Sequence, residues 1–566
     1  MSIELGTALR LAGMFAATAA TGTNAQILYY VDDDAPPGGS GSSWQSPFRT
    51  LDDALAAAAA QVGGMAEIRI AGGTYIPNPE GGTRASTFAC EPPPVHSAVS
   101  LWLRGGYAGY GSPVPNAREI DAFRTVLSGD RLGNDGPNFA NYEDNCFHVV
   151  TVLPEPGGET SSVGFDGLTI RGGAADLVEP NSARGLGAGV LARRGKTVVG
   201  PTFLQARLVE NRAVLDGGGG YFEGGVPRFN SSEVARNAAL RHGGGIWIGT
   251  GEFTYIADSV FSENTAVLGG GIFKSDTKFG ELLIWRSIFA ANAAIGATPL
   301  GGGICALVGQ THMTSCVLTR NTATGGDGGA YAFAPTSGGL STVNDCTFTG
   351  NTASLGGAIS SLFAGYLECT NVICWNDGAQ AIGSEVFIDT DAGARAWFVQ
   401  CDVQGGRPLI GTSGPNNVVW TNSINLDPRF TSPDGPDGNP ETWRDNDLRL
   451  RPHSPCIDSG NGDRPYTNQP DLDVAGQTRR VDDRWTPEMF PGGDPRIDMG
   501  AYEFQGSSCA ADCSNNGLVN VVDFVCFQNR YATGDILANC DQSTVPPVLN
   551  VADFICFMTA YAAWCS

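Results

Sequence analysis

Oxygen-bearing residues recur at regular intervals in the stretch DCSNNGLVNVVDF, near the end of the chain. They stand at positions 1, 3, 5, 9 and 12 of a twelve-residue loop, with Gly517 at position 6 and a backbone carbonyl available at position 7. This spacing lets a loop surround Ca²⁺, a hard cation that takes six to eight oxygen ligands. The expected ligands are Asp512, Ser514, Asn516, Leu518 (through its carbonyl), Asn520 and Asp523.

A second, altered copy of the loop follows in DQSTVPPVLNVADF. It has one extra residue, and Pro546 and Pro547 replace the glycine of the first loop. Each copy continues into a predicted helix, so two calcium ions are expected, with the second loop the weaker site. The alternative is that one or both loops are metal-free polar turns held by disulfides. The expected ligands of the second loop are Asp541, Ser543, Asn550 and Asp553.

The rest of the sequence has no set of residues spaced for catalysis. A glycosidase needs two carboxylates on one face, and a polysaccharide lyase needs acidic calcium ligands beside an arginine or lysine base. Acids are sparse and isolated through residues 203–383, and His242 is a lone histidine that we expect to be solvated. Arg171, Arg193 and Arg194 could serve as bases but have no identifiable partner. The catalytic residues, if any, are therefore unknown from the sequence.

A repeated unit fills the middle of the chain. It consists of an apolar residue, two further residues, an asparagine and, a few residues later, two to four glycines, as in FSENTAVLGGGIF. The asparagines of the repeat are Asn211, Asn237, Asn264, Asn292, Asn321, Asn351 and, in a decayed copy, Asn376. Their spacing of 25 to 30 residues is too short for a propeller blade of roughly 40 residues, and no amphipathic helix fits within a unit. One coil of a parallel β-helix fits this length.

Stacked coils place equivalent residues in columns about 4.8 Å apart. The apolar residues are expected to fill the interior, and the asparagines to link their side-chain amides at a sharp turn. Asparagine tolerates the left-handed conformation that we expect at such a turn. The glycines would supply positive φ and close backbone approach at the next corner. The alternative is that the asparagine column binds sugar or metal.

Charge and composition restrict the function. There are 34 basic and 58 acidic residues, a net charge of −24, which argues against nucleic-acid binding because that needs a basic surface. The small, apolar run LAGMFAATAATGTNA predicts a signal peptide over residues 1–25, with a short buried helix as the alternative. No later run reaches the ~18 apolar residues of a membrane helix. We therefore expect an extracellular protein, free or at the cell surface.

Cysteines divide the chain into two parts. Nine of the 15 are scattered through the body, whereas six lie in the last 58 residues and predict a small disulfide-stapled module over residues 509–566. The odd number in the body leaves at least one thiol unpaired there. Residues 26–505 are expected to form the β-helix, with regular repeats at about 203–383. An alanine-rich helix at Leu51–Gln61 would cap its first coil.

Several of these stretches resemble known families. The opening YYVDDDAPPGG, the repeated units and the closing SPCIDSG and IDMGAYEF together resemble secreted bacterial β-helix proteins of the pectin-lyase-like superfamily. The units also resemble the repeats of chlamydial polymorphic outer-membrane proteins, and residues 509–566 resemble a dockerin of the cysteine-containing type. The resemblance implies an all-β, right-handed parallel β-helix solenoid. It also implies a small α-helical calcium module that docks onto a cohesin-like or cell-surface partner.

Together these features predict an exported, adhesin-like scaffold that presents an extended surface to carbohydrate or to another cell and is anchored through its C-terminal module. The alternative is a polysaccharide lyase or glycoside hydrolase on the same fold. The fold alone does not decide between binding and cleavage, because function depends on the site that a fold carries.

Overall fold

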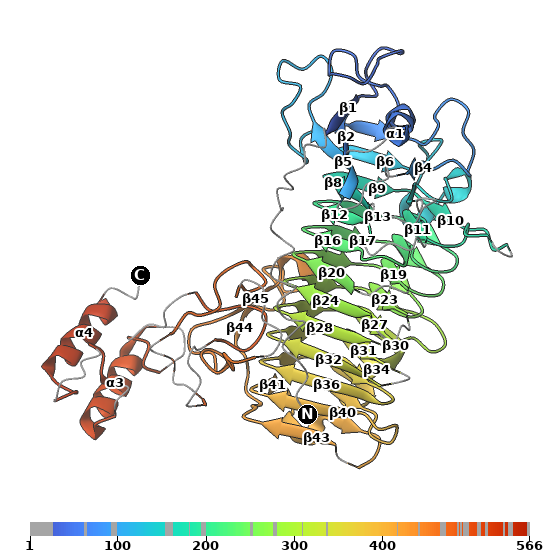
Figure 1. Ribbon diagram of the computed structural model, residues 1–566. Coiled ribbons are helices and arrows are strands. Elements are labelled where there is room, and N and C mark those ends of the chain that lie inside the picture. The colour runs from blue at the N-terminus through green and yellow to red at the C-terminus, as the bar shows by residue number, and fades with distance from the viewer. Residues whose placement is uncertain are drawn as a thin grey trace, which may run out of the picture.

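Parallel sheets wind the chain into a parallel β-helix in the computed structural model (Figure 1). The model describes residues 26–562 except for 61–64, 92–98, 153–161, 180–181, 194–199, 250–252, 276–279, 308, 336–337, 416, 440–441, 465–470, 484–485, 487–488, 491–496, 506–510, 515–518, 536–537 and 542–546. The predicted signal peptide lies outside the described residues. No described helix is long and apolar enough to cross a membrane.

Each regular coil passes through four sheets, which we call I to IV in chain order. Sheet I contains β1 (Ile27–Val31), β2 (Ala66–Ala71), β5 (Val99–Tyr107), β8 (Ser162–Asp166), β12 (Thr202–Leu204), β16 (Arg228–Asn230), β20 (Phe253–Ala257), β24 (Glu281–Trp285), β28 (Gln310–Thr314), β32 (Gly339–Asn344), β36 (Gly365–Thr370), β40 (Arg395–Val399) and β43 (Val418–Thr421). Sheet II contains β3 (Gly73–Tyr75), β6 (Thr125–Ser128), β9 (Leu168–Arg171), β13 (Arg207–Val209), β17 (Glu233–Ala235), β21 (Val260–Ser262), β25 (Ile288–Ala290), β29 (Val317–Thr319), β33 (Thr347–Thr349), β37 (Ile373–Trp375) and β41 (Asp402–Val403).

Sheet III is the shortest of the four and consists of β10 (Ala174–Ala175), β14 (Arg212–Ala213), β18 (Ala238–Ala239), β22 (Thr265–Ala266), β26 (Ala293–Ala294), β30 (Thr322–Asp327), β34 (Thr352–Leu355) and β38 (Gly378–Ile382). Sheet IV completes each coil with β4 (Phe88–Cys90), β7 (Val150–Val152), β11 (Val190–Arg193), β15 (Gly220–Glu223), β19 (Ile246–Ile248), β23 (Ile272–Lys274), β27 (Ile304–Ala306), β31 (Tyr331–Phe333), β35 (Ile359–Ser361), β39 (Val386–Ile388) and β42 (Gly411–Thr412).

A few described elements lie outside these sheets. They are α1 (Leu51–Ala59), α2 (Gly406–Leu409), α3 (Val521–Thr533), α4 (Val551–Ala562), the 3-10 helices η2 (Pro137–Phe139), η3 (Tyr142–Asp144) and η4 (Trp443–Asp445), and the antiparallel strands β44 (Phe430–Ser432) and β45 (Asp447–Leu450). The predicted β-helix is thus confirmed in its sheets. Its right-handed sense stays the expectation for parallel crossovers.

The interior of the coils is built from apolar columns. On sheet II the residue three before each repeat asparagine points inward, so that Phe261 pairs in register with Val234 on one side and Phe289 on the other. All three side chains are fully buried. Because successive side chains of a strand alternate between its faces, the neighbouring residues of each strand are left to form the outer surface.

Helix α1 closes the N-terminal end of the solenoid, as predicted. Thr50 caps it by accepting a hydrogen bond from the Asp53 amide, a common start signal for a helix. Its buried face, which includes Leu51 and Leu55, joins the same core as Ile68 of the first coils. The helix therefore covers apolar side chains that the first coil would otherwise expose.

The repeat asparagines form a continuous hydrogen-bonded column. The Asn264 side chain accepts from the backbone amide and the side-chain amide of Asn237, both at 3.0 Å. Its own amide donates to Val234 O and to the side-chain oxygen of Asn292. The same pattern runs from Asn211 to Asn351, and each of these six asparagines is at most 1% exposed. A column so buried and so fully bonded has no free groups for a sugar or a metal.

The decayed repeat departs from the expected pattern by one residue. Asp377, not Asn376, occupies the next position of the column, since its carboxylate accepts from the backbone and side-chain amides of Asn351 at 2.7 Å. The left-handed conformation likewise belongs to the residue before each column position, such as Glu263 with φ 58° and Asn376 with φ 62°. The column residue therefore supplies the side-chain hydrogen bonds, and the residue before it adopts the left-handed conformation of the turn.

The glycines that follow each asparagine have two distinct roles. Gly269 has φ +64°, a left-handed backbone that disfavours other residues. Gly270 and Gly271 have no room for a side chain, because an added Cβ would lie 2.4 and 2.6 Å from the carbonyl oxygens of Gly302 and Gly303 in the next coil. Glycine thus permits the close stacking of coils at this corner.

A second column, at the corner between sheets I and II, accounts for Cys316 and Cys346 among the nine body cysteines. Ser259 and Ser287 each donate a hydrogen bond to the carbonyl two residues earlier. In later coils Cys316 and Cys346 make the same contact through sulfur. All nine body cysteines are buried free thiols, so these residues act as small core side chains.

Residues 424–505 do not continue the coil, although the predicted β-helix domain includes them. They pack along the outer face of sheet II, where Ile457 and Met499 join Val317 and Ile373 in one apolar cluster. A buried ion-pair network reinforces the contact. Arg464 pairs with Asp345 of the coil and with Asp471 of the tail, and Arg479 lies 3.7 Å from Asp345 and 3.9 Å from Glu503.

Replacing Asn264 with leucine should destabilise the β-helix. The change leaves buried groups of Asn237, Asn292 and Val234 without partners, at a cost of roughly 1–3 kcal/mol for each unsatisfied group. Thermal unfolding followed by circular dichroism should show a lower Tm than for the exposed control Asn134→Leu. An unchanged Tm would contradict the structural role of the column.

The acidic residues at the C-terminal end of the asparagine column should make the thermal stability of the protein depend on pH. Asp377 and Glu385 are buried side by side, and burial raises the pKa of both carboxyl groups. In the unfolded chain both carboxyl groups titrate near 4. Their contribution to the free energy of unfolding is therefore complete below that pH, and it is lost as the pH rises through the raised pKa values of the folded protein. Glu385→Gln cannot ionise, and its Tm relative to wild type should therefore increase from pH 4 to pH 8. Equal pH profiles for this variant, for wild type and for the exposed control Glu143→Gln would contradict the assignment.

Candidate functional site

Two clusters of arginine and aromatic side chains lie on the outer face of sheet I. In the first, the Arg228 guanidinium is 5.5 Å from the Tyr255 ring centroid. The Tyr255 ring in turn lies 6.2 Å from Phe253 and 6.0 Å from Trp285, both in near-parallel orientation. Trp285 is only 7% exposed, while Arg228, Phe253 and Tyr255 are half-buried. We call these four residues the upper cluster.

The lower cluster consists of Tyr366, Arg395 and Trp397, on strands β36 and β40. The Tyr366 and Trp397 rings stack at 5.8 Å with an interplanar angle of 12°, and the Arg395 guanidinium is 5.6 Å from the Tyr366 centroid. Tyr366 is 39% exposed. The exposed Tyr366 ring and the half-buried Trp397 ring therefore form one aromatic surface on this face.

Strand register creates both clusters. Arg228 pairs with Tyr255, and Tyr366 pairs with Arg395, so residues 27 and 29 positions apart become neighbours. The sequence analysis did not single out these residues. The alternation in EFTYIA and RAWFV, where aromatic or charged residues occupy every second position, is the signal that could have found them.

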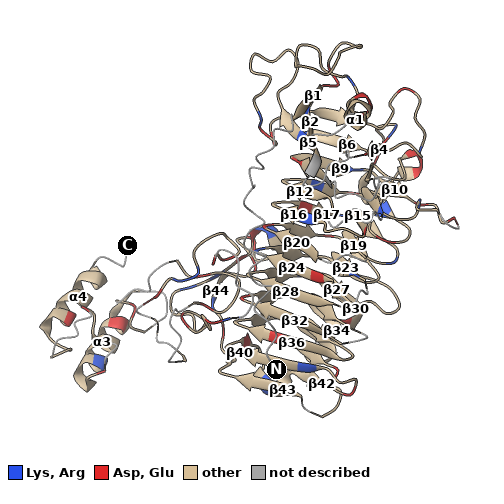
Figure 2. Cartoon of the chain, viewed as in Figure 1, with Lys and Arg blue, Asp and Glu red and all other residues tan. Residues whose placement is uncertain are grey.

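The arginines of the two clusters differ from most arginines of this acidic chain. Among the described residues, neither Arg228 nor Arg395 has an acidic partner, whereas ion pairs are frequent elsewhere. Figure 2 shows that charged residues are sparse over the strands of the sheets. Six strand steps separate β16 from β40 in sheet I, which is about 29 Å at ~4.8 Å per step. A ligand that contacts both arginines must therefore be extended.

Two carboxyl groups share this face. Glu281 pairs in register with Phe253, and Glu368 pairs with Trp397. Burial raises the pKa of both carboxyl groups. They lie on β24 and β36, three strand steps apart, or about 14 Å. That exceeds the ~5–9.5 Å between the two carboxylates of glycosidases, so they do not form such a pair.

The basic residues considered in the sequence as bases are held by acids. Arg171 lies 3.5 Å from Glu210, and Arg193 lies 3.3 Å from Glu223; Arg194 lies outside the described residues. The expectation that His242 is a lone solvated residue is wrong. Its Nδ1 is 2.9 Å from Asp216 of the preceding coil, and its ring stacks on Phe273 at 4.5 Å. Coil stacking brings these residues together across 26 and 31 sequence positions.

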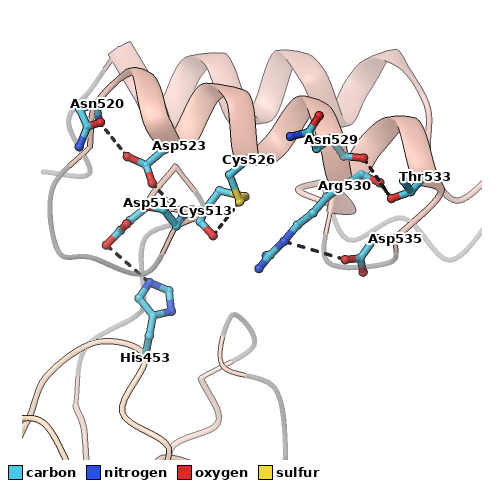
Figure 3. The surroundings of a disulfide bond; sticks show 11 residues. His453, Asp512, Cys513, Asn520, Asp523, Cys526, Asn529, Arg530, Thr533 and Asp535 are labelled. Atoms are coloured by element: carbon cyan, nitrogen blue, oxygen red, sulfur yellow. Dashed lines mark hydrogen bonds and ion pairs between the residues drawn. A yellow bond between two sulfur atoms is a disulfide. The ribbon is translucent and has the colours of Figure 1, made fainter.

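The described parts of the first predicted calcium loop, on either side of residues 515–518, meet at one buried carboxylate (Figure 3). Asp523, fully buried, accepts hydrogen bonds from the amides of Ser514 at 2.8 Å and Asn520 at 2.9 Å. Burial acts to raise the pKa of Asp523, but these hydrogen bonds outweigh it and the pKa is lowered. Asp512 is also buried, with His453 of the tail 3.9 Å away. Asn516 and Leu518 lie outside the described residues.

The second loop repeats this arrangement despite its prolines. Asp553 is fully buried and accepts from the amides of Asp541 at 3.1 Å and Asn550 at 2.7 Å. Ser543 and Pro546 lie outside the described residues. Disulfides join Cys513 to Cys526 and Cys540 to Cys556, which ties each loop to its helix. The Phe527 and Phe557 rings stack at 4.1 Å between the two halves.

Both loops have a donor set suited to a hard cation. Each brings an acid at its first and last positions to the start of a helix, together with amide and hydroxyl oxygens. Carboxylate and carbonyl oxygens are the ligands that Ca²⁺ prefers. In the first loop both Asp512 and Asp523 are buried, which is costly unless a cation or hydrogen bonds balance their charge. In the second loop Asp553 is buried and Asp541 is exposed. The arrangement therefore fits Ca²⁺, whose binding stays a prediction.

Comparison with known proteins identifies no family. The chain matches no family model and no curated protein. Among solved structures it is similar to "Crystal structure of pectate lyase Pel9A", with a TM-score of 0.45 and 16% identity over 85% of this chain and 97% of that one. A second structure, "Glycoside hydrolase", gives a TM-score of 0.28 and 9% identity over 70% of this chain and 96% of that one. The parallel β-helix therefore rests on the strand pairing of the chain itself.

Each of the two loops should bind one calcium ion. We expect Asp523→Ala and Asp553→Ala each to remove one of two ions from the full-length, metal-stripped protein, measured by calorimetric titration. Calcium at 100 times its Kd should stabilise the module by about 2.7 kcal/mol. The control Asp535→Ala changes an acid that lies between the two loops in sequence and pairs with Arg530, and it should keep both ions. A flat titration of the oxidised wild-type protein would exclude calcium binding.

Proposed function

We propose that this protein is an extracellular β-helix that binds an acidic polysaccharide along the outer face of sheet I. The observation that carries the proposal is the pair of arginine–aromatic clusters, whose arginines have no acidic partner in the described part of the chain. In a protein of net charge −24, two such arginines on one face favour an anionic ligand at these points.

The chemistry of the clusters suits a chain of acidic sugars. A sugar ring is apolar on its faces and can stack on Tyr366, Trp397 or Tyr255, as amphipathic ligands do on aromatic side chains. The planar guanidinium of Arg228 or Arg395 can bind a carboxylate through two hydrogen bonds. Because Arg228 and Arg395 are about 29 Å apart by strand spacing, a ligand that contacts both arginines would have to be a polymer.

The C-terminal module would anchor this surface. The two helices expose apolar residues at equivalent places: Val521 and Val551, which are 67% and 69% exposed, and Val525 and Ile555, which are 49% and 60% exposed. Solvent-exposed apolar residues repeated on two related helices favour docking onto a protein partner. The partner would be cohesin-like or part of a cell surface. The disulfides of the module suit an extracellular location, where such bonds persist.

A polysaccharide lyase or glycoside hydrolase is the second candidate. The observation that favours it is the position of Glu281 and Glu368, which have raised pKa values and lie beside the clusters. A carboxyl group with a raised pKa is better suited to transfer protons near neutral pH. Since the two groups are too far apart to act as a glycosidase pair, each would have to work with groups of its own cluster.

Removing both unpaired arginines should weaken polysaccharide binding. We expect Arg228→Gln/Arg395→Gln to bind polygalacturonate about tenfold more weakly than wild type, which is about 1.4 kcal/mol. Binding by wild type should also fall with added salt, because salt screens exposed charges. Isothermal titration with polygalacturonate and with neutral dextran measures both effects, and analysis of the same mixtures for shortened chains tests for cleavage.

The matched control is Arg449→Gln, which removes an exposed arginine that is paired with Asp447 outside the clusters. This variant should bind polygalacturonate as wild type does. Equal affinity for dextran and polygalacturonate, or full binding by the double variant, would contradict the proposed ligand class. Cleavage that is lost in Glu281→Gln or Glu368→Gln while binding persists would favour the enzyme.

A further inference from the structure

A cavity of about 430 Å³ lies on a different face, beside the middle strands of sheet II. Strands β13, β17 and β21 and their corners with sheet I supply one wall, including Arg207, Glu233 and Asp258. Ile120 and Asp121 supply a second wall, and Trp443 and Arg444 of the tail complete the lining. Small-ligand sites are typically roughly 300–1,000 Å³, so the volume suits one or two sugar residues.

Trp443 is the aromatic wall of the cavity, and the coil fixes its position. The Arg444 guanidinium lies 4.6 Å from the Trp443 ring centroid. Arg444 in turn forms an ion pair at 2.6 Å with Glu263, which lies 181 positions earlier in the chain. A ring positioned in this way offers a rigid apolar surface, which reduces the entropy that a ligand loses by ordering the site.

The charges around the cavity are already paired. Arg207 lies 3.4 Å from both Asp121 and Glu233, and Asp258 accepts two hydrogen bonds from Arg286 at 2.7 and 2.8 Å. Arg444 is paired with Glu263. A charged ligand would have to break one of these pairs, whereas hydroxyl groups can donate to the carboxylates and accept from the arginines without doing so. This is the opposite of the two sheet I clusters, where Arg228 and Arg395 have no acidic partner among the described residues.

We propose that this cavity binds a neutral sugar residue, with Trp443 against its apolar face and Arg207 and Glu233 bonded to its hydroxyl groups. Aromatic stacking plus a few convergent polar groups is the usual composition of a small-ligand site. The site is separate from the sheet I surface in its lining and in its charge, so either one can exist without the other.

Saturation-transfer NMR on the full-length protein tests the site directly. The probes are the methyl glycosides of glucose, galactose and mannose, with sodium glucuronate as the charged comparison. We expect at least one neutral glycoside to bind with a Kd on the order of 1–10 mM and more tightly than glucuronate. Trp443→Ala should weaken that binding at least about tenfold, and Glu233→Gln about threefold to tenfold, since each removes one of the two kinds of contact.

Two further variants make the result decisive. Trp443→Phe keeps an apolar ring and should retain part of the binding, which separates loss of stacking from loss of the folded tail. Trp397→Ala removes an aromatic ring of the lower cluster, so it should weaken polygalacturonate binding but leave glycoside binding unchanged; Trp443→Ala should do the reverse. The site is refuted if no neutral glycoside binds wild type at tens of millimolar, if Trp443→Ala binds as wild type, or if glucuronate binds best.

Discussion

The stacking of one coil on the next at the distance of a β-sheet hydrogen bond governs this structure. The asparagine column makes the constraint visible, because each side-chain amide donates a hydrogen bond to the asparagine of the following coil and is buried away from solvent. A coil that slipped by one residue would leave buried polar groups unpaired, so the column fixes register. Every outer-face neighbour relation described above, including both arginine–aromatic clusters, depends on that register.

The two surfaces differ in how the chain pairs its arginines. Several arginines along the coils meet an acid one coil away, as Arg286 meets Asp258 and Arg236 meets Glu210. Such pairs contribute little to stability when exposed, but they leave no charge for a ligand. Arg228 and Arg395 instead lie over aromatic rings. The different pairing suits sheet I to an acidic polymer and the cavity by sheet II to neutral hydroxyl groups.

Cysteine is used in opposite ways in the two parts of the chain. In the β-helix it fills interior columns as a thiol, where a large core already provides stability. The C-terminal module is too small for such a core, and small domains of this kind rely on disulfides or metals. Its disulfides hold loops that the buried carboxylates Asp523 and Asp553 organise. Calcium would complete the balance of charge there.

The sequence by itself determined what repeats or lies close along the chain. The spacing of Asn211 to Asn351 was enough to predict coils and a buried column, and Asp512 to Asp523 defined a loop, because both patterns are local. The shift from Asn376 to Asp377, the His242–Asp216 contact and the pairing of Arg228 with Tyr255 could not be read in the same way. They depend on register between coils, which varies with loop length. The cavity could be predicted even less, since Trp443 is about 180 to 320 residues away in sequence from the residues that line its other walls. Only the folding of the tail back over sheet II, driven by burial of apolar side chains such as Ile457 and Met499, decided that contact.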